Sequence, residues 1–130
     1  MAKSSGFLAG LEPHVLSLFR LVVGLFYMEH GLIKLFGFPA GHTVALFSLL
    51  GLAGIIETFG GFLVAIGLFT RPAAFIMSGE MAIAYFKVFA PHGFFPILNH
   101  GETAGLYCFI FLYLAVAGGG TWSLDRLRAR

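Results

Sequence analysis

The sequence predicts an all-α integral membrane protein, a four-helix bundle formed by a single domain over residues 1–130. Hydrophobic residues make up 58% of the chain and charged residues only 11%, which excludes an ordinary soluble domain. The chain has four long apolar stretches. At a rise of about 1.5 Å per residue, the first three are long enough to cross a hydrocarbon core of roughly 30 Å, and the fourth is nearly long enough. The predicted helices are Val15–Phe36, Val44–Phe69, Pro72–Ala90 and Thr103–Gly118.

The first stretch is expected to be a retained membrane helix and not a cleaved signal peptide. It is longer than the apolar core of a signal peptide, and no small-x-small cleavage site follows it. It also contains several ionisable residues, namely Arg20, Glu29, His30 and Lys34.

The linkers have turn chemistry. Residues 37–41 contain two glycines and Pro39, and Thr70-Arg71-Pro72 places a proline where it suits the first turn of the third helix. The third linker, 91–102, is rich in Phe, Ile and Leu, so we expect it to lie at the membrane interface. After the glycines that end the fourth helix, Trp122 is placed like an interfacial anchor.

Lysine and arginine residues predict the orientation of the bundle. The first and third linkers contain none, whereas five lie on the side that holds both termini and the second linker: Lys3, Arg71, Arg126, Arg128 and Arg130. By the positive-inside rule, both termini are expected in the cytoplasm and the third linker outside.

Ionisable residues inside the apolar stretches indicate a functional centre, because charges at that depth are costly and usually face the bundle interior. Helix rise places His30 at about 22 Å from the cytoplasmic end, Glu57 at about 18 Å and Glu80 at about 12 Å. His30 and Glu57 are therefore the first candidate pair. Lys34 shares a helix face with His30, and these three residues are the candidate catalytic set.

Arg20 lies at a depth of about 7 to 8 Å and is the residue closest in depth to Glu80. The two are predicted to form a structural ion pair. Arg20 begins a helix face whose small residues allow close helix approach; its other members are Gly24, Tyr27, Gly31 and Lys34. Glu29 is about 180° from Arg20 around the helix, so it faces a different cleft, a protomer interface or, when protonated, lipid.

The remaining polar residues are weaker candidates. Tyr85 and Tyr107 have polar tips suited to contact with a quinone. Glu102 suits the N-terminal dipole of the fourth helix. His92 and His100 in the third linker match no structural zinc spacing, which makes them weak candidates for a metal site. Cys108 has no partner cysteine and is read as a packing residue.

An ordered set of short motifs resembles the DoxX family of small four-helix bacterial inner-membrane proteins. The set comprises His30-Gly31-x-x-Lys34-x-Phe36-Gly37, Glu57-x-x-Gly60-Gly61, Gly67-x-x-Thr70-Arg71, Gly79-Glu80-Met81-Ala82, Asn99-x-Gly101-Glu102 and Gly118-x-Gly120-x-x-Ser123-x-Asp125. The resemblance implies four helices in a bacterial inner membrane and an association with redox work, since the family name comes from a thiosulfate:quinone oxidoreductase subunit.

The resemblance singles out six residues of this chain: His30, Lys34, Glu57, Arg71, Glu80 and Glu102. Relatives carry a histidine near the end of the third helix where this chain has Phe89, which further weakens the metal interpretation.

Three functions fit these observations. In the first, an inner-membrane protein contacts a quinone-like head group or another small ligand through His30, Glu57 and Lys34. A redox partner protein or a bound cofactor then brings the electrons, because the chain has no cysteine ligands for iron–sulfur and no Rossmann fingerprint. The second is a non-enzymatic scaffold, and the third is a small-molecule or proton transporter. Lipid is an expected partner and a homo-oligomer is left open, whereas the net charge of +2, without a basic stripe, excludes nucleic acid.

Overall fold

The first helix is longer than the apolar pattern predicted. The structure, a computed structural model, describes residues 6–129, and α1 spans Gly6–Phe36 where the sequence predicted a start at Val15. Pro13 removes one backbone donor without ending the helix. The helix ends at Phe36 because the next residue, Gly37, has a left-handed φ of 66°, which glycine adopts without a steric clash. The N–H of Gly37 donates to the carbonyl of Ile33 at 2.9 Å.

The second span is built from three consecutive pieces. These are α2 (Leu49–Ile55), the π-helical turn η1 (Ile56–Gly60) and α3 (Gly61–Ile66). The span starts later than the predicted Val44 because the Ser48 hydroxyl accepts from the N–H of Gly51 at 3.1 Å and so caps α2. It ends before the predicted Phe69 because Gly67 turns left-handed at φ 73°.

The third span begins at Thr70, so Arg71 lies in its first turn and not in a linker. It comprises α4 (Thr70–Ala84), the π-helical turn η2 (Tyr85–Phe89) and the 3₁₀ turn η3 (Ala90–His92). The Asp125 carboxylate caps α4 by accepting from the N–H groups of Phe69 at 2.7 Å and Thr70 at 2.9 Å. The chain continues through α5 (Pro96–Asn99), α6 (Glu102–Ala117) and α7 (Leu124–Arg128).

Within residues 6–129 all of these elements are helical, as the sequence predicted. Three spans are long and apolar enough to cross a membrane, namely Gly6–Phe36, Leu49–Ile66 and Thr70–His92. The fourth, α6, is a shorter apolar helix of 16 residues. The protein is therefore an all-α membrane bundle of four helical spans.

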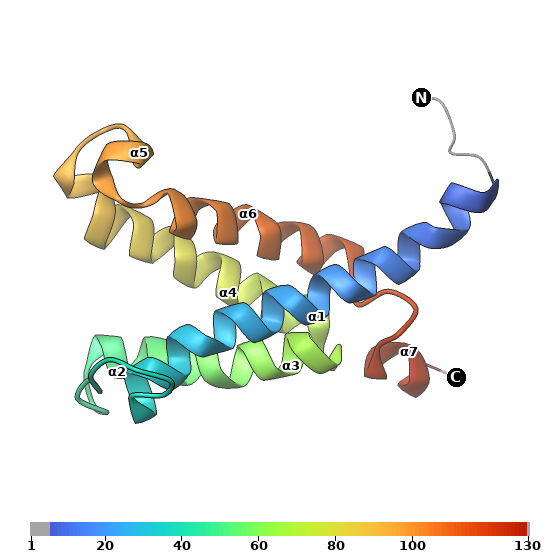
Figure 1. Cartoon of the computed structure of the whole chain (residues 1–130), viewed down its shortest axis with the longest axis horizontal. Coiled ribbons are helices and arrows are strands. Elements are labelled where there is room, and N and C mark those ends of the chain that lie inside the picture. The colour runs from blue at the N-terminus through green and yellow to red at the C-terminus, as the bar shows by residue number, and fades with distance from the viewer. Residues whose placement is uncertain (1–5, 130) are drawn as a thin grey trace.

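The four spans are arranged as two pairs (Figure 1). One pair is α1 with α2, η1 and α3, and the other is α4 with α6. The pairs meet near α3 and the start of α4, and they diverge toward the end that holds α2 and α5. The start of α1 and the C-terminal helix α7 lie at the opposite end.

Glycines allow the first pair to pack closely, as the helix face beginning at Arg20 predicted. A Cβ added at Gly24 would lie 2.8 Å from the carbonyl oxygen of Gly61, and one added at Gly61 would lie 2.9 Å from that of Gly24. The apolar core lies where the pairs meet, and its fully buried members include Val64, Met77 and Phe111.

The C-terminal loop closes the end of the bundle that holds the start of α1 and α7. The N–H of Thr121 donates to the carbonyl of Pro13 at 3.3 Å, and the Trp122 ring contacts that of His14 edge-on with centroids 4.7 Å apart. Arg71, Arg126 and Arg128 lie at this end. Lys3 and Arg130, which also contributed to the predicted orientation, lie outside the described residues.

Candidate functional site

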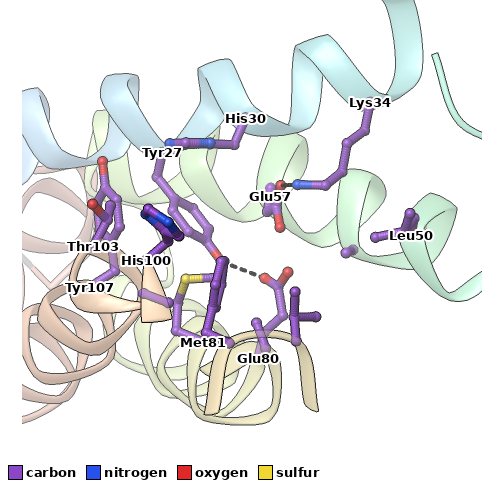
Figure 2. Close-up of a pocket in the computed structure, with 15 residues that line it drawn as sticks. Tyr27, His30, Lys34, Leu50, Glu57, Glu80, Met81, His100, Thr103 and Tyr107 are labelled. Atoms are coloured by element: carbon purple, nitrogen blue, oxygen red, sulfur yellow. Dashed lines mark hydrogen bonds and ion pairs between the residues drawn. The ribbon is translucent and has the colours of Figure 1, made fainter. Parts of the chain in front are cut away.

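The divergence of the two helix pairs leaves a cavity of about 290 Å³, which we call the polar cavity (Figure 2). It is lined by Tyr27, His30 and Lys34 of α1, Leu50 and Ala53 of α2, Glu57 of η1, Glu80, Met81 and Ala84 of α4, Val88 and Phe89 of η2, and His100, Thr103, Ala104 and Tyr107 in or just before α6. The buried side chains of Tyr27 and Met81 belong both to the core and to the lining, so they separate the cavity from the packed half of the bundle. At the opposite boundary His30, His100 and Thr103 are exposed.

Lys34 and Glu57 form a salt bridge inside this cavity, with Nζ 2.6 Å from Oε1. The Glu57 side chain is only 3% exposed, whereas that of Lys34 is 24% exposed. A charge-assisted contact of this length offsets part of the cost of placing a carboxylate away from water. The contact also links α1 to η1.

The prediction that Glu57 pairs with His30 is therefore wrong. His30 lines the same cavity, but Glu57 pairs with Lys34. The depth estimated from helix rise places the Cα atom of Lys34 one turn beyond that of His30. However, Cα–Cβ bonds tilt toward the N-terminus of a helix. The four-carbon stem of Lys34 therefore brings its ammonium group back to the level of Glu57.

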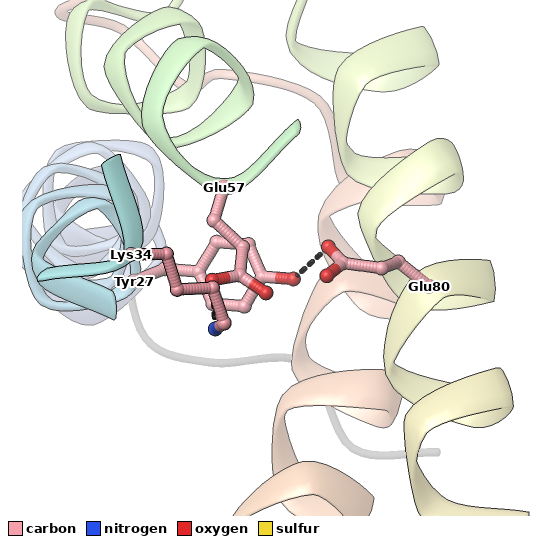
Figure 3. A network of polar contacts seen from close by, with 4 residues as sticks. All are labelled: Tyr27, Lys34, Glu57 and Glu80. Atoms are coloured by element: carbon pink, nitrogen blue, oxygen red, sulfur yellow. Dashed lines mark hydrogen bonds and ion pairs between the residues drawn. The ribbon is translucent and has the colours of Figure 1, made fainter. Parts of the chain in front are cut away.

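Tyr27 donates a hydrogen bond from its hydroxyl to Oε1 of Glu80 and thereby joins α1 to α4. Figure 3 shows Tyr27, Lys34, Glu57 and Glu80 converging from three elements on one small volume. Tyr27 is 1% exposed, so its ring packs in the core while its hydroxyl reaches the cavity. The sequence indicated only that Tyr27 shares a helix face with Lys34; its role as partner of Glu80 was missed.

The predicted ion pair between Arg20 and Glu80 is wrong. The Arg20 guanidinium donates to backbone carbonyls at the opposite end of the bundle: that of Gly119, that of Trp122 at 3.0 Å and that of Ala65 at 3.3 Å. Arg20 is 3% exposed. The C-terminal loop, folded back onto α1, supplies these acceptors, and hydropathy patterning does not reveal a loop carbonyl.

Two π-helical turns contribute to the cavity, and neither was predicted. η1 carries Glu57, and η2 carries Val88 and Phe89. A π turn adds one residue to a helical turn, which changes the direction of the side chains, and such turns are frequent at functional sites. No residue type in either segment signals the change in hydrogen-bonding pattern.

The two predicted quinone-facing tyrosines differ in position. Tyr107 lines the polar cavity, with its ring 5.2 Å from that of Tyr27 and 6.0 Å from that of His30. Tyr85 is not among the residues that line it; its hydroxyl accepts a hydrogen bond from Nδ2 of Asn99 at 3.2 Å. Asn99 is 1% exposed and also donates to the Gly93 carbonyl at 2.9 Å, so this pair holds the third linker in place.

The helix-end and metal candidates lie apart from one another. Arg71 and Glu102 are exposed near the starts of α4 and α6, and neither lines the polar cavity. His92 is exposed in η3, whereas His100 lines the cavity. Within residues 6–129 no group of three or more His, Cys, Asp or Glu side chains is placed to hold a metal ion.

Comparison with known proteins agrees with this architecture. The sequence profile of the DoxX family matches residues 15–90, which contain Lys34, Glu57 and Glu80. The chain belongs to the DoxX family. An uncharacterized protein of Haemophilus influenzae is 44% identical over 121 residues, which cover 88% of this chain and 90% of that relative.

A second relative in the comparison is described as a membrane protein. This uncharacterized membrane protein of Mycobacterium tuberculosis is 30% identical to the DoxX chain over 126 residues, covering 82% of this chain and 77% of the relative. No solved structure is significantly similar. The DoxX chain is thus a membrane protein with bacterial relatives.

Proposed function

We propose that the polar cavity binds the head group of a membrane quinone and that the protein serves a redox system of the bacterial inner membrane. The observation that carries the proposal is the cavity itself. Its volume of about 290 Å³ is near the lower limit of small-ligand sites, which suits one substituted ring. It combines apolar and aromatic lining with a few convergent polar groups, as small-ligand sites generally do.

The lining supplies the contacts that a quinone needs. A quinone ring has two carbonyl oxygens that accept hydrogen bonds, and His30, Lys34 and Thr103 carry donors that line the cavity. The Tyr107 ring offers an aromatic surface for offset or edge contact with the bound ring.

Reduction of a quinone to a quinol consumes two electrons and two protons. Glu57, Glu80 and His30 line the polar cavity and are able to pass protons to the quinone oxygens. The two electrons would come from the reduced flavin or iron–sulfur centre of a partner redox protein. This division of tasks makes the DoxX chain the quinone-binding subunit.

Binding of a quinone to the purified protein in nanodiscs tests this function. We expect Lys34→Met and His30→Leu each to weaken binding about ten-fold, because each removes a donor to a quinone oxygen. Glu29→Gln is the matched control, since Glu29 is the exposed neighbour of His30 and does not line the cavity. Failure of the wild-type protein to bind any quinone, or equal loss in the control, would overturn the proposal.

A scaffold function is the second candidate, and one observation favours it. Both strong polar contacts of the cavity connect different spans, Lys34 with Glu57 and Tyr27 with Glu80. If these contacts only hold helices together, Tyr27→Phe lowers the stability of the bundle while the quinone has no effect on its unfolding. A quinone that raises the unfolding temperature of the wild-type protein argues against the scaffold, because a ligand stabilises only the state that it binds.

We also propose that the end of the bundle that holds the start of α1 and α7 faces the cytoplasm. Arg71, Arg126 and Arg128 lie at this end, and the polar cavity lies toward the other. The distribution of arginines supports this orientation through the positive-inside rule.

A further inference from the structure

We propose that the ligand of the polar cavity carries a long hydrocarbon chain, which leaves the cavity between α2 and α4 and lies in a groove that faces the lipid. This inference rests on the proposed function, because it concerns the same site. The ligand is then an amphiphile with a ring-sized polar head and an apolar chain. Its route of access is the bilayer, and not the aqueous phase.

The first observation is a second cavity, of about 350 Å³, on the outer side of the gap between α2 and α4. We call it the α2–α4 groove. Its lining is mainly aliphatic and includes Leu49, Leu52, Ile76 and Ile83; Glu80 and Lys87 are its charged members. A hydrocarbon chain suits this lining, whereas a polar molecule would lose its hydrogen bonds there.

The second observation is that the α2–α4 groove and the polar cavity are adjacent. Five residues line both: Leu50, Ala53, Glu80, Ala84 and Val88. Glu80 therefore lies between them, and its carboxylate is on the polar side, where it accepts the hydrogen bond from Tyr27. A molecule whose head contacts this polar centre would extend its chain past Ala84, a small side chain that lines both spaces, into the groove.

The arrangement of the helices explains why the groove is on this side. η1 and α3 pack against α4, whereas α2 diverges from it toward the α5 end (Figure 1). The side chains along the gap are exposed to the surroundings, with Leu50 at 52% and Ile83 at 63%. In a membrane such apolar surfaces contact lipid, so the gap opens into the hydrocarbon core.

Gly79 provides a direct test of the groove. It lines the α2–α4 groove and does not line the polar cavity, and a Cβ added to it meets no atom within 4 Å. A phenylalanine at this position has room on its own helix and projects into the space that the chain would occupy. Gly105 in α6 is the matched control, because it too has open space within 4 Å and lines neither cavity.

The experiment measures binding of two quinones to the protein in nanodiscs: 2,3-dimethoxy-5-methyl-1,4-benzoquinone, and the same ring with a decyl chain. We expect Gly79→Phe to weaken binding of the decyl quinone about ten-fold, because the two groups compete for one space, and to leave binding of the chainless ring unchanged. Gly105→Phe should change neither. The chain need not raise affinity in the wild-type protein, because lipid is as apolar as the groove.

The outcomes separate the inference from the proposed function. If the wild-type protein binds neither quinone, the proposed function fails. If it binds both and Gly79→Phe behaves like Gly105→Phe, the function stands and the groove inference is wrong.

A photolabel gives a second measurement that does not depend on a folded variant. A decyl quinone with a diazirine at the chain end should label wild-type residues of α2 and α4, such as Leu52 and Ile83. Labelling confined to the third linker, 91–102, would overturn the inference.

Discussion

The ammonium group of Lys34 lies 2.6 Å from a carboxylate oxygen of Glu57, and this is the one salt bridge formed among residues 6–129. It crosses from α1 to η1 within one helix pair, and it faces the cavity between the pairs. The contact therefore has two consequences, one for the stability of the bundle and one for any ligand that approaches Glu57.

Removing either member of this pair should destabilise the protein. Lys34→Met leaves the buried Glu57 carboxylate without its cation, and we expect a loss of about 2–4 kcal/mol. Adding Glu57→Leu to that variant should recover much of the loss, because no charge is then stranded. Chemical unfolding in detergent measures the cycle. Additive single effects would contradict the contact, and Lys87→Met, which alters an exposed lysine, serves as the control.

Arg20 and Glu80 should behave as independent residues. Arg20→Leu removes the hydrogen-bond donor of three backbone carbonyls. Glu80→Leu removes the acceptor of the Tyr27 hydroxyl. Each change should cost about 1–3 kcal/mol. The double variant should show the sum of the two costs, because the side chains share no partner. A coupling energy well above about 0.5 kcal/mol would mean that the two residues meet.

The Asp125 cap of α4 should make stability depend on pH in the acid range. Burial alone would raise the pKa of Asp125, but hydrogen bonds from Thr70 and Phe69 outweigh it and hold the pKa below its ordinary value. A carboxylate with a lowered folded-state pKa stabilises the protein above its unfolded pKa of about 4, and that contribution is lost as the pH falls through the folded pKa.

Asp125→Asn isolates this effect. At pH 7 the variant should be less stable than the wild type by about 0.3–1 kcal/mol, because asparagine keeps one acceptor oxygen but lacks the negative charge that favours the N-terminus of α4. The difference should shrink as both proteins are unfolded at successively lower pH between 7 and 3. A difference that stays constant over this range would show that the charge of Asp125 contributes nothing.

Cysteine labelling in whole cells measures the orientation of the bundle in the membrane. In a Cys108→Ala background, His92→Cys should react with an impermeant thiol reagent, and Ala129→Cys should react only after the cells are opened. Both positions are exposed, so accessibility of the side chain does not limit either reaction. The reverse pattern would place the termini outside.

The sequence by itself determined the class of the fold and three ionisable residues of the polar centre, but not Tyr27. Apolar stretches of membrane length predict helices because the backbone must satisfy its own hydrogen bonds in lipid. Ionisable residues inside them predict an internal centre because charge is costly there, and Lys34, Glu57 and Glu80 do meet at one cavity. The spacing of Gly24 and Gly31 likewise predicted the face of α1 that packs closely.

Only the tertiary structure decided which of these residues are partners. Helix rise gives the depth of a Cα atom but not the tilt of a span or the reach of a side chain. It therefore predicts a pair of His30 and Glu57, whereas Glu57 forms its salt bridge with Lys34. The acceptors of Arg20 are carbonyls of a folded-back loop, and no side-chain pattern encodes them. The π turns and the divergence of the helix pairs arise from packing between spans, and they create the space in which the polar centre lies.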